Sequence, residues 1–406
     1  MRGKNERARP GPTVNHAIQK LLRPTWAEIS LSALSRNFGR VRRLAGERKV
    51  TAVIKADAYG HGSVPLARCL AQAGADAFAV ATVEEAVELR QAEIHQPILL
   101  LGGLYLSDPA DLIHYQLTPV VSSTARLDTY AECARQHNRP IAFHLKVDTG
   151  LGRLGMPPGR IHSFVERYRE LERSAALKDG SPGLQLTGLM THLASAQDLV
   201  STQTDEQLGI FNFALGQLRR LGIEPESIHV SNSAALLTRT GFPENLVRVG
   251  ALLYGYCMPL VLPPGVQPPA VPPFEPILTF KSRVVYLKDV PSGTPLGYGA
   301  AYHTRRPSRI ATVPVGYADG LSRALSNRGR AIVRGQNAAI VGTISMDLTL
   351  LDVTDIPGVN FGDEVILIGK SDHWSITALE IAQQLDTVPY EVLCSIGKRV
   401  PRIYVE

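Results

Sequence analysis

The stretch VTAVIKADAYGHGS, residues 50–63, decides how this chain folds. Residues 50–54 form an uncharged run of β-favouring side chains, and they deliver a single lysine, Lys55, into a glycine-containing turn over residues 56–62. Because lysine strongly resists full burial, a lysine at the end of a core strand is usually held there by a partner or a covalent bond. The pattern leaves one alternative open, in which the Lys55 ammonium reaches solvent beyond the strand end. The stretch therefore predicts a buried strand that ends in a reactive amine.

Strand and helix patterns alternate around this stretch. Eight apolar runs predict eight strands, at residues 50–54, 77–81, 97–101, 118–121, 141–147, 186–190, 228–231 and 246–249. Helical periodicity lies between them, for example over residues 83–91, 124–137 and 205–221. A β-then-α rhythm repeated eight times predicts an α/β fold of the (β/α)₈ or TIM-like barrel type, in which active sites lie at the carboxyl ends of the strands.

A proline-rich segment separates the barrel from a second domain. Seven prolines fall between residues 263 and 276, and they forbid a helix and most ladder pairing. Beyond them, β-like segments at 278–287, 309–315, 330–333, 338–344, 349–353, 364–368 and 402–405 surround one helix at 377–385. We therefore expect a basic disordered leader at 1–24, the barrel at 25–262, an extended linker at 263–276 and a mainly β C-terminal domain at 277–406.

The charge of the chain is concentrated near its N-terminus. Residues 1–24 hold six basic residues and one acidic residue, so +5 of the formal net charge of +6 belongs to them and +1 to the remainder. A body without a basic stripe is not typical of nucleic-acid-binding proteins, and we expect no nucleic-acid partner. Without an apolar run of about 18 residues or a secretory signal pattern, we expect a cytoplasmic protein with no membrane partner. The cysteines are too widely spaced for a zinc site, so no metal is expected.

Three motifs at strand ends carry groups suited to anions. HLKVDTGLGRLG, residues 144–155, includes Arg153, whose guanidinium can bind the carboxylate of an amino acid through two parallel hydrogen bonds. HVSNSAALL, residues 229–237, and NLVRVGALLYG, residues 245–255, follow the seventh and eighth strands with hydroxyl and backbone N–H groups. A phosphate held between these two strands is a recurring arrangement in barrels.

The string AVIKADAYGHG, residues 52–62, closely resembles the signature of the alanine racemases. The resemblance covers nearly all of residues 26–406. It implies a fold-type III enzyme whose Lys55 carries pyridoxal 5'-phosphate (PLP) covalently. It also implies an isomerase that interconverts L-alanine and D-alanine and supplies D-alanine for peptidoglycan.

The resemblance assigns roles to residues of the barrel. Arg153 would contact the cofactor's phenolic oxygen and the substrate carboxylate, and Lys146, carbamylated in many family members, would orient it. His192 would pack against the cofactor ring and bond to Arg248, which would donate to the pyridine nitrogen. The implied cofactor-binding set is Lys55, Tyr59, Arg153, His192, Asn232, Ser233, Arg248, Gly250, Ala251 and Tyr390.

The β domain is similar to that of the same family in the strings GTPLGYGAAYHT, PVGYADGLSR and ISMDLTLLDV. The match implies that Tyr298 is the acid–base group opposite Lys55 and that it comes from the other subunit of a head-to-tail homodimer with shared active sites. Met346 would offer its backbone N–H to the substrate carboxylate. Tyr317 and Tyr390 would line the entrance or the phosphate, with Asp347 as a supporting residue. Arg248 and His192 are expected to supply the positive charge that lets the phenol act as a base.

Three other functions compete with alanine racemisation. A barrel-fold PLP decarboxylase would place a carboxylate near the pyridine nitrogen, where this chain has Arg248. A non-catalytic PLP carrier would not need the β domain with Tyr298. A serine or broad-specificity amino-acid racemase stays open, because a hydroxymethyl group differs little from a methyl group to a small pocket.

Overall fold

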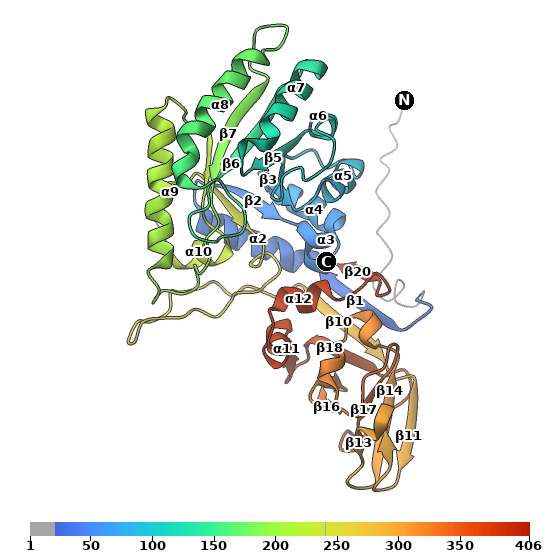
Figure 1. Cartoon of the computed structure of the whole chain (residues 1–406). Helices are drawn as coiled ribbons and strands as arrows, with labels where there is room; N and C mark the ends of the chain where they lie inside the picture. The colour runs from blue at the N-terminus through green and yellow to red at the C-terminus, as the bar shows by residue number, and fades with distance from the viewer. Residues whose placement is uncertain (1–20, 240) are drawn as a thin grey trace, which may run out of the picture. The chain divides into compact units, whose positions relative to one another are not determined.

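The computed structural model describes residues 21–239 and 241–406, and the chain divides into two compact units (Figure 1). The barrel unit is Ala33–Glu275. The β unit is Pro276–Glu406 together with the described residues before Ala33. Residues 1–20 of the leader predicted for residues 1–24 lie outside the described part of the chain. The predicted boundaries at 262 and 276 stay predictions.

Eight parallel strands form the barrel. In spatial order they are β8 (Ser227–His229), β7 (Leu184–Met190), β6 (Ile141–Lys146), β5 (Leu117–Val121), β4 (Ile98–Leu100), β3 (Ala77–Val80), β2 (Lys49–Val53) and β9 (Leu246–Val249). Each predicted strand run overlaps one of them, and the predicted TIM-like barrel is confirmed. The strands are near-continuous apolar runs because helices cover the outside of a parallel sheet.

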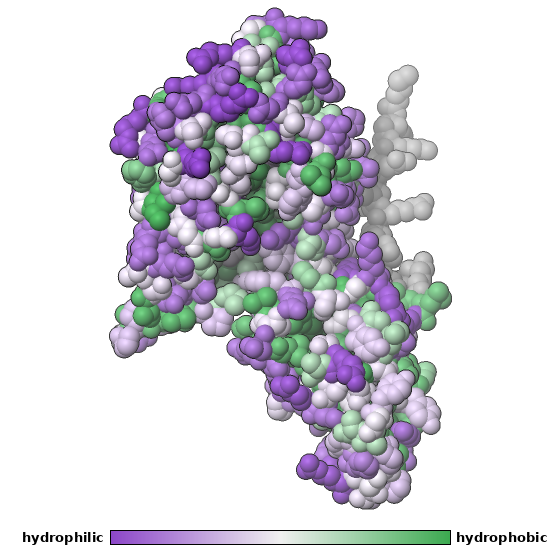
Figure 2. All heavy atoms as spheres, viewed as in Figure 1, coloured by the Kyte–Doolittle hydropathy of each residue, from purple (hydrophilic) through white to green (hydrophobic). Residues whose placement is uncertain are grey.

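The helices lie around these strands (Figure 1). They are α2 (Leu31–Ala45), α3 (Lys55–Gly60), α4 (Ser63–Gln72), α5 (Val83–Gln91), α6 (Ala110–His114), α7 (Leu127–His137), α8 (Ile161–Ser174), α9 (Gln203–Arg220) and α10 (Ser233–Thr238), with 3₁₀ turns η1 (Thr124–Arg126) and η2 (Pro158–Arg160). Each long helix buries one stripe. On α8 that stripe is Ile161, Phe164, Val165, Tyr168 and Leu171. Figure 2 shows hydrophilic residues over the visible outer surface of α7 and α8.

Side chains of Glu244 and Arg48 add hydrogen bonds between β8 and β9, where few backbone bonds join the two strands. Between β8 and β9 the backbone bonds run from Asn245 N to Ile228 O and from Arg248 N to Ser231 O. Glu244 adds to this seam, since its carboxylate, with no exposed surface, accepts from Val230 N at 3.0 Å and from Ser231 N at 2.8 Å. Arg48 donates to the same carboxylate at 2.7 Å. The eighth junction of the barrel therefore combines two backbone bonds with bonds from Val230 N and Ser231 N to the buried Glu244 carboxylate.

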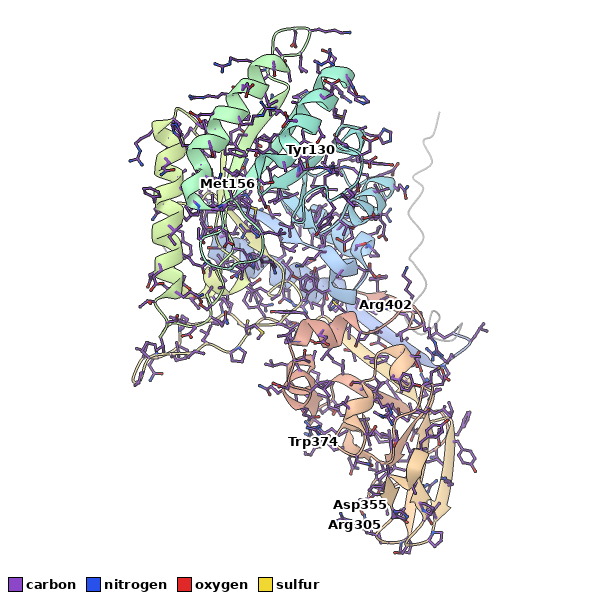
Figure 3. All side chains as sticks on the ribbon, in the orientation of Figure 1. Tyr130, Met156, Arg305, Asp355, Trp374 and Arg402 are labelled. Carbon is purple, nitrogen blue, oxygen red and sulfur yellow. The ribbon has the colours of Figure 1, made fainter. Side chains whose placement is uncertain are left out.

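The barrel is filled by side chains at the level of the strand ends. Val53, Ala79, Leu99, Val120 and Met190 form one buried cluster from five strands. Tyr59 packs on this cluster from α3. In Figure 3, Tyr130 on α7 and Met156 after β6 also lie in the barrel unit, and both are almost fully buried. The barrel is a packed core that can support a site at its end but not a pore.

The β unit contains a ten-stranded, mainly antiparallel sheet. Its main path is β11 (Tyr286–Val290), β14 (Ser308–Val313), β17 (Thr349–Asp352), β16 (Gln336–Ile340), β15 (Arg330–Val333), β18 (Glu364–Lys370), β10 (Leu278–Arg283), β1 (Thr25–Ser30) and β20 (Arg402–Val405), with β19 (Ser375–Ile376) paired to β18. A two-stranded hairpin, β12 (Pro295–Leu296) and β13 (Tyr302–His303), stands apart from it. The remaining elements are α11 (Ala378–Gln384), α12 (Pro389–Cys394), η3 (Tyr298–Ala300), η4 (Tyr317–Asp319) and η5 (Arg323–Leu325). The predicted β domain is confirmed, whereas α12 and the hairpin were not predicted.

The start of the described chain differs from the sequence expectation. Residues 25–30 were expected in the barrel, but β1 pairs antiparallel with β10 and parallel with β20, which makes it an inner strand of the β unit. The leader was expected to be disordered through residue 24, but the Arg23 guanidinium donates to Asp319 at 2.6 Å. Local sequence pattern predicts a strand here without revealing which sheet receives it, because the partner residues lie about 250 positions away on β10 and 375 positions away on β20.

Within the part of the chain that the structure describes, no helix has the length and apolar character needed to span a membrane. The four cysteines there are all free, and only Cys133 is fully buried. No group of three histidine, cysteine or acidic side chains in the described residues is arranged to hold a metal ion.

Candidate active site

Lys55 follows β2 after one residue, Ile54, and begins a left-handed turn. Residues 56–59 have φ values of 51–57°, although none of them is glycine. A left-handed helical residue with a Cβ costs roughly 1–2 kcal/mol. Such a turn persists only where the surroundings over-determine it, and such strain is concentrated at functional sites.

Two acidic side chains hold this turn. The Glu85 carboxylate on α5 accepts from Ala56 N at 2.6 Å and from Ala81 N at 2.7 Å. The Asp57 carboxylate accepts from Ser63 N at 2.6 Å, at the start of α4. The backbone that carries Lys55 is thereby fixed at both ends. The half-buried Lys55 lies at the carboxyl edge of the barrel, as predicted.

The turn places Tyr59 against the end of β9. The Tyr59 and Tyr254 ring centroids are 4.7 Å apart, and the Tyr254 hydroxyl donates to Val53 O at 2.8 Å. A Cβ at Gly250 would lie 2.8 Å from the Tyr59 oxygen. A side chain at this position, directly after β9, would therefore require the Tyr59 ring to shift.

Arg248 is almost fully buried, with 4% of its surface exposed. Within the described residues its two terminal nitrogens donate to five acceptors: His229 O, His229 Nδ1, Thr191 O, Val230 O and His192 Nδ1, at 2.7–3.4 Å. Burial lowers the pKa of this guanidinium from 12.5 to about 10. Arg248 therefore remains a fixed cation and donor at neutral pH.

Two histidines behind Arg248 were not predicted from the sequence. Because a guanidinium can only donate, the Nδ1 atom of His229 must accept from it, and the opposite nitrogen then faces His144 Nδ1 at 2.9 Å. Burial and the charge of Arg248 lower the pKa of His144 to about 4 and that of His229 well below its usual value. These neutral rings fix the direction of the Arg248 side chain. The period-two spacing of His144 and Lys146 on β6 was the one available signal.

His192 contacts Arg248 as predicted, but it is not a cation. Its Nδ1 lies 3.4 Å from the guanidinium. Burial and the neighbouring charges of Arg248, Lys146, Arg153 and Lys55 lower its pKa to about 3. The expectation that His192 adds positive charge beside the acid–base groups is therefore wrong. The cationic groups of the cluster are Arg248, Arg153 and the lysines.

Lys146 ends β6 with 5% of its surface exposed. Burial, Arg153 and Arg248 lower its pKa from 10.5 to about 8, while Asp148 acts in the opposite direction. The loop that follows is ordered by Asp148, which accepts from the backbone N–H groups of residues 150, 151 and 152 at 3.1 Å each. Arg153 rises from this loop with an exposed side chain. The strand end thus offers a buried amine beside a guanidinium that can reach a ligand.

Ser233 and Gly250 form the candidate phosphate contact. The Ser233 hydroxyl, directly after the N-cap residue Asn232 of α10, accepts from Gly250 N at 3.1 Å. Ala251, with 8% of its surface exposed, continues the same loop after β9. The cluster holds an amine, a buried cationic donor and hydroxyl and N–H donors. A PLP carbonyl, ring nitrogen and phosphate require these three kinds of partner, so the residues fit this cofactor.

The second predicted set lies in the β unit. Tyr298 stands at the tip of the β12–β13 hairpin with 74% of its surface exposed, and its carbonyl accepts from the Thr343 hydroxyl at 3.1 Å. Tyr317 begins η4, whose backbone donates to Ser345 O and Met346 O at 3.1 Å. Tyr390 is on α12. Met346 and Asp347 are adjacent in an exposed loop.

The structure therefore brings the predicted residues together in two groups. In the barrel unit, mutual electrostatic effects place five of them in one cluster: Lys55, Lys146, Arg153, His192 and Arg248. In the β unit, backbone hydrogen bonds join the segments of Tyr317 and Met346. The roles of the predicted residues stay predictions, and His144, His229, Glu85 and Glu244 are supporting residues that sequence reasoning missed.

Comparison with known proteins gives one family across the chain. A sequence model of the alanine racemase N-terminal domain matches residues 29–258, and one of the alanine racemase C-terminal domain matches residues 277–404. An alanine racemase of Halothermothrix orenii is 43% identical over 387 residues, 95% of this chain and 98% of that protein.

Solved structures agree with this result. Alanine racemase from a D-cycloserine-producing Streptomyces lavendulae has a TM-score of 0.87 and 33% identity, covering 95% of this chain and 98% of that one. Alanine racemase from Bartonella henselae, solved with covalently bound pyridoxal phosphate, has a TM-score of 0.80 and 29% identity, covering 94% and 99%.

Proposed function

This chain belongs to the alanine racemase family of PLP-dependent isomerases, and we propose that Lys55 and Tyr298 are the two groups that move the α-proton of its substrate. The observation that carries this proposal is the charged cluster around Lys55 at the carboxyl edge of the barrel. Inverting a stereocentre requires one group to remove a proton from one face and another to deliver a proton to the opposite face.

The residues of the barrel unit would bind and orient. Ser233 and the N–H groups of Gly250 and Ala251 would hold the cofactor phosphate, with Tyr390 and Asn232 as further members of the predicted set. Tyr59 would belong to the cofactor-binding set from α3. PLP, when bound, supplies an electrophilic carbonyl and an electron-withdrawing ring. Arg248 would donate to the ring nitrogen through Nε–H, because its five acceptors in the described residues all engage the terminal nitrogens.

Arg248 also limits which reaction the site favours. A guanidinium does not give up its proton at neutral pH, so the ring nitrogen beside it would stay unprotonated and withdraw electrons less strongly. That favours return of the proton to Cα over competing chemistry. Arg153 and Met346 N–H would hold the substrate carboxylate, which keeps the α-hydrogen directed at the acid–base groups.

Lys55 Nζ would accept or deliver the proton on one face and Tyr298 Oη on the other, with roles reversed for the opposite enantiomer. Tyr298 is exposed in the single chain, which supports a shared site in a head-to-tail homodimer. Supply of D-alanine for peptidoglycan and a cytoplasmic location stay predictions. Specificity for alanine over serine is likewise proposed, and chiral chromatography of products from a panel of L-amino acids measures it.

Subunit mixing tests the two-group proposal. Lys55→Ala and Tyr298→Phe are each expected to lose racemisation by roughly 10²–10⁴-fold, the typical worth of a positioned acid–base group. If the two groups meet across subunits, mixing the inactive variants should restore up to about a quarter of wild-type activity, since half the dimers are mixed and each has one intact site. Borohydride reduction of wild type should label Lys55 on peptide mapping. A mixture that stays inactive after mass spectrometry shows exchanged subunits contradicts the shared site.

A further inference from the structure

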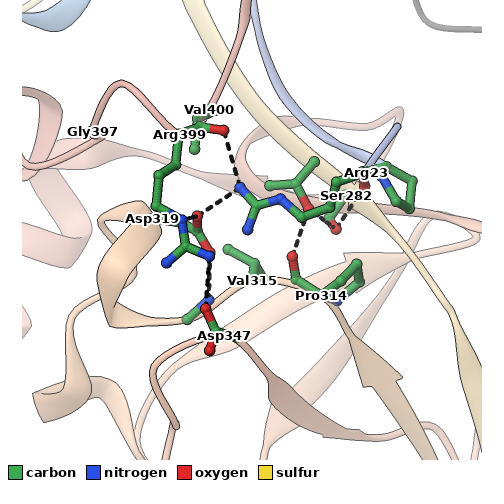
Figure 4. Close-up of polar contacts among 12 residues, drawn as sticks. Arg23, Ser282, Pro314, Val315, Asp319, Asp347, Gly397, Arg399 and Val400 are labelled. Atoms are coloured by element: carbon green, nitrogen blue, oxygen red, sulfur yellow. Dashed lines mark hydrogen bonds and ion pairs between the residues drawn. The ribbon is translucent and has the colours of Figure 1, made fainter. Parts of the chain in front are cut away.

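The β unit contains an ionic cluster around a buried carboxylate, Asp319, that the proposed mechanism does not use. Asp319 has no exposed surface, and its Oδ1 lies 2.6 Å from Arg23 Nη2 and 3.6 Å from Arg399 Nε (Figure 4). Arg399 in turn donates to Asp347 at 2.7 Å. Two guanidiniums and two carboxylates therefore alternate. A buried carboxylate is retained in a core only where such partners compensate its desolvation.

Asp319 is connected to the segment of Tyr317 on the same turn. Its Oδ2 accepts from Gly316 N at 3.1 Å, which closes η4 around its own side chain. A Cβ at Gly316 would lie 2.3 Å from Ser345 O. The turn that begins with Tyr317 is thus pressed directly against the backbone before Met346.

The same cluster reaches the segment of Met346 from the other side. Ala318 N donates to Met346 O at 3.1 Å, and the Arg399 guanidinium holds the neighbouring Asp347 carboxylate. The same Arg399 guanidinium also forms an ion pair with Asp319. The exposed loop of Met346 is therefore joined to the turn of Asp319 by the backbone bond from Ala318, and to Asp319 itself through the shared Arg399.

A third connection runs to the helix of Tyr390. The Ser395 hydroxyl, at the end of α12, donates to Gly320 O at 3.1 Å, and a Cβ at Gly320 would lie 2.6 Å from Ser395 O. Four residues later Arg399 O accepts from Arg23 at 3.1 Å. The chain leaving α12 is thus fixed on both sides of Asp319.

We propose that Asp319 is a positioning residue. It sets the mutual placement of the segments that carry Tyr317, Met346 and Tyr390, and it acts through Arg23 and Arg399 rather than by touching substrate or cofactor. This inference rests on the proposed function, because the consequence of misplacing Met346 N–H is weaker binding of the substrate carboxylate. The contacts of Asp319 with the guanidiniums are charge-assisted, so they hold these segments more firmly than the contacts of a neutral side chain would.

Asp319→Asn tests the proposal because it keeps the shape and one acceptor oxygen but removes the charge. Per active site, we expect the KM for alanine to rise at least 10-fold with a smaller fall in kcat. Hydrogen exchange of the peptides covering residues 316–320 and 345–348 should speed up in the cofactor-free and loaded protein alike. The matched control is Glu28→Gln, which breaks another partly buried ion pair of the same unit, to Lys281 at 3.0 Å.

A role in overall stability alone would lower the melting temperature of both variants and leave KM unchanged, and that result overturns the inference. Should Asp319→Asn not fold, Arg399→Met on the exposed side of the cluster carries the same test. Arg399→Met removes the link that Asp347→Asn also cuts, so the double variant should raise KM no more than Arg399→Met alone. Multiplying effects would overturn the proposed link. A wild type that turns over no alanine would instead refute the proposed function.

Discussion

We expect Lys146 to be carbamylated, and its lowered pKa gives the fraction of reactive, neutral amine. The amine must be neutral to react with CO₂, forming an N–C bond and releasing one proton. With a pKa of about 8, roughly one chain in ten holds neutral Lys146 at pH 7, whereas a pKa of 10.5 gives about 300-fold fewer. Burial therefore prepares this lysine for the reaction, and the anion formed would lie beside Arg153 and Arg248.

The stability consequence has a definite sign. Because the unfolded chain holds this proton up to about pH 10.5 and the folded chain only up to about pH 8, the free energy of unfolding in CO₂-free buffer rises with pH between these values. Below pH 8 the buried ammonium costs roughly 3 kcal/mol, at ~1.4 kcal/mol per factor of ten. Lys146→Met removes the charge at similar volume, so this rise with pH should disappear in the variant.

The assay compares melting with and without bicarbonate at pH 8. Wild type should melt a few degrees higher in bicarbonate, since a modification confined to the folded state stabilises it, whereas Lys146→Met should melt alike in both buffers. Carbon-13 NMR with labelled bicarbonate should show a carbamate signal that Lys146→Met lacks and that Lys281→Met keeps. Equal melting of wild type in both buffers, together with no carbamate signal, would refute the reasoning.

Two further predictions concern the barrel. Gly250→Ala places a Cβ 2.8 Å from the Tyr59 oxygen, so PLP affinity, measured by fluorescence titration, should fall about 10-fold, as overpacking by 1–3 kcal/mol implies. Adding Tyr59→Phe to this variant should restore part of the lost affinity. An unchanged PLP affinity in Gly250→Ala would show that the loop adapts freely. Glu244→Gln should lower the free energy of unfolding, measured in urea, by about 3 kcal/mol, because it leaves buried donors and Arg48 without their anion. A decrease in this free energy no larger than that caused by the more exposed Glu380→Gln would contradict the prediction.

The sequence by itself determined most of the local elements and identified the candidate site residues. Eight apolar runs at strand length, separated by helical periodicity, were sufficient for the barrel, because burial on both faces leaves a direct imprint on each strand. Lys55, Arg153, Arg248 and Tyr298 could be named because their motifs are contiguous. The hairpin around Tyr298 and helix α12 were not predicted, since short elements carry too few residues to show a period.

Only the tertiary structure decided which distant groups meet. β1 joins the β unit because its hydrogen-bonding partners are β10 and β20, and no local pattern identifies such partners. The left-handed turn at residues 56–59 depends on Glu85 of another helix, which offsets a strain that local propensity opposes. His192 is neutral because folding removes it from water beside fixed cations. Asp319 likewise becomes an ionic centre only when Arg23 and Arg399, from the two ends of the chain, converge on it.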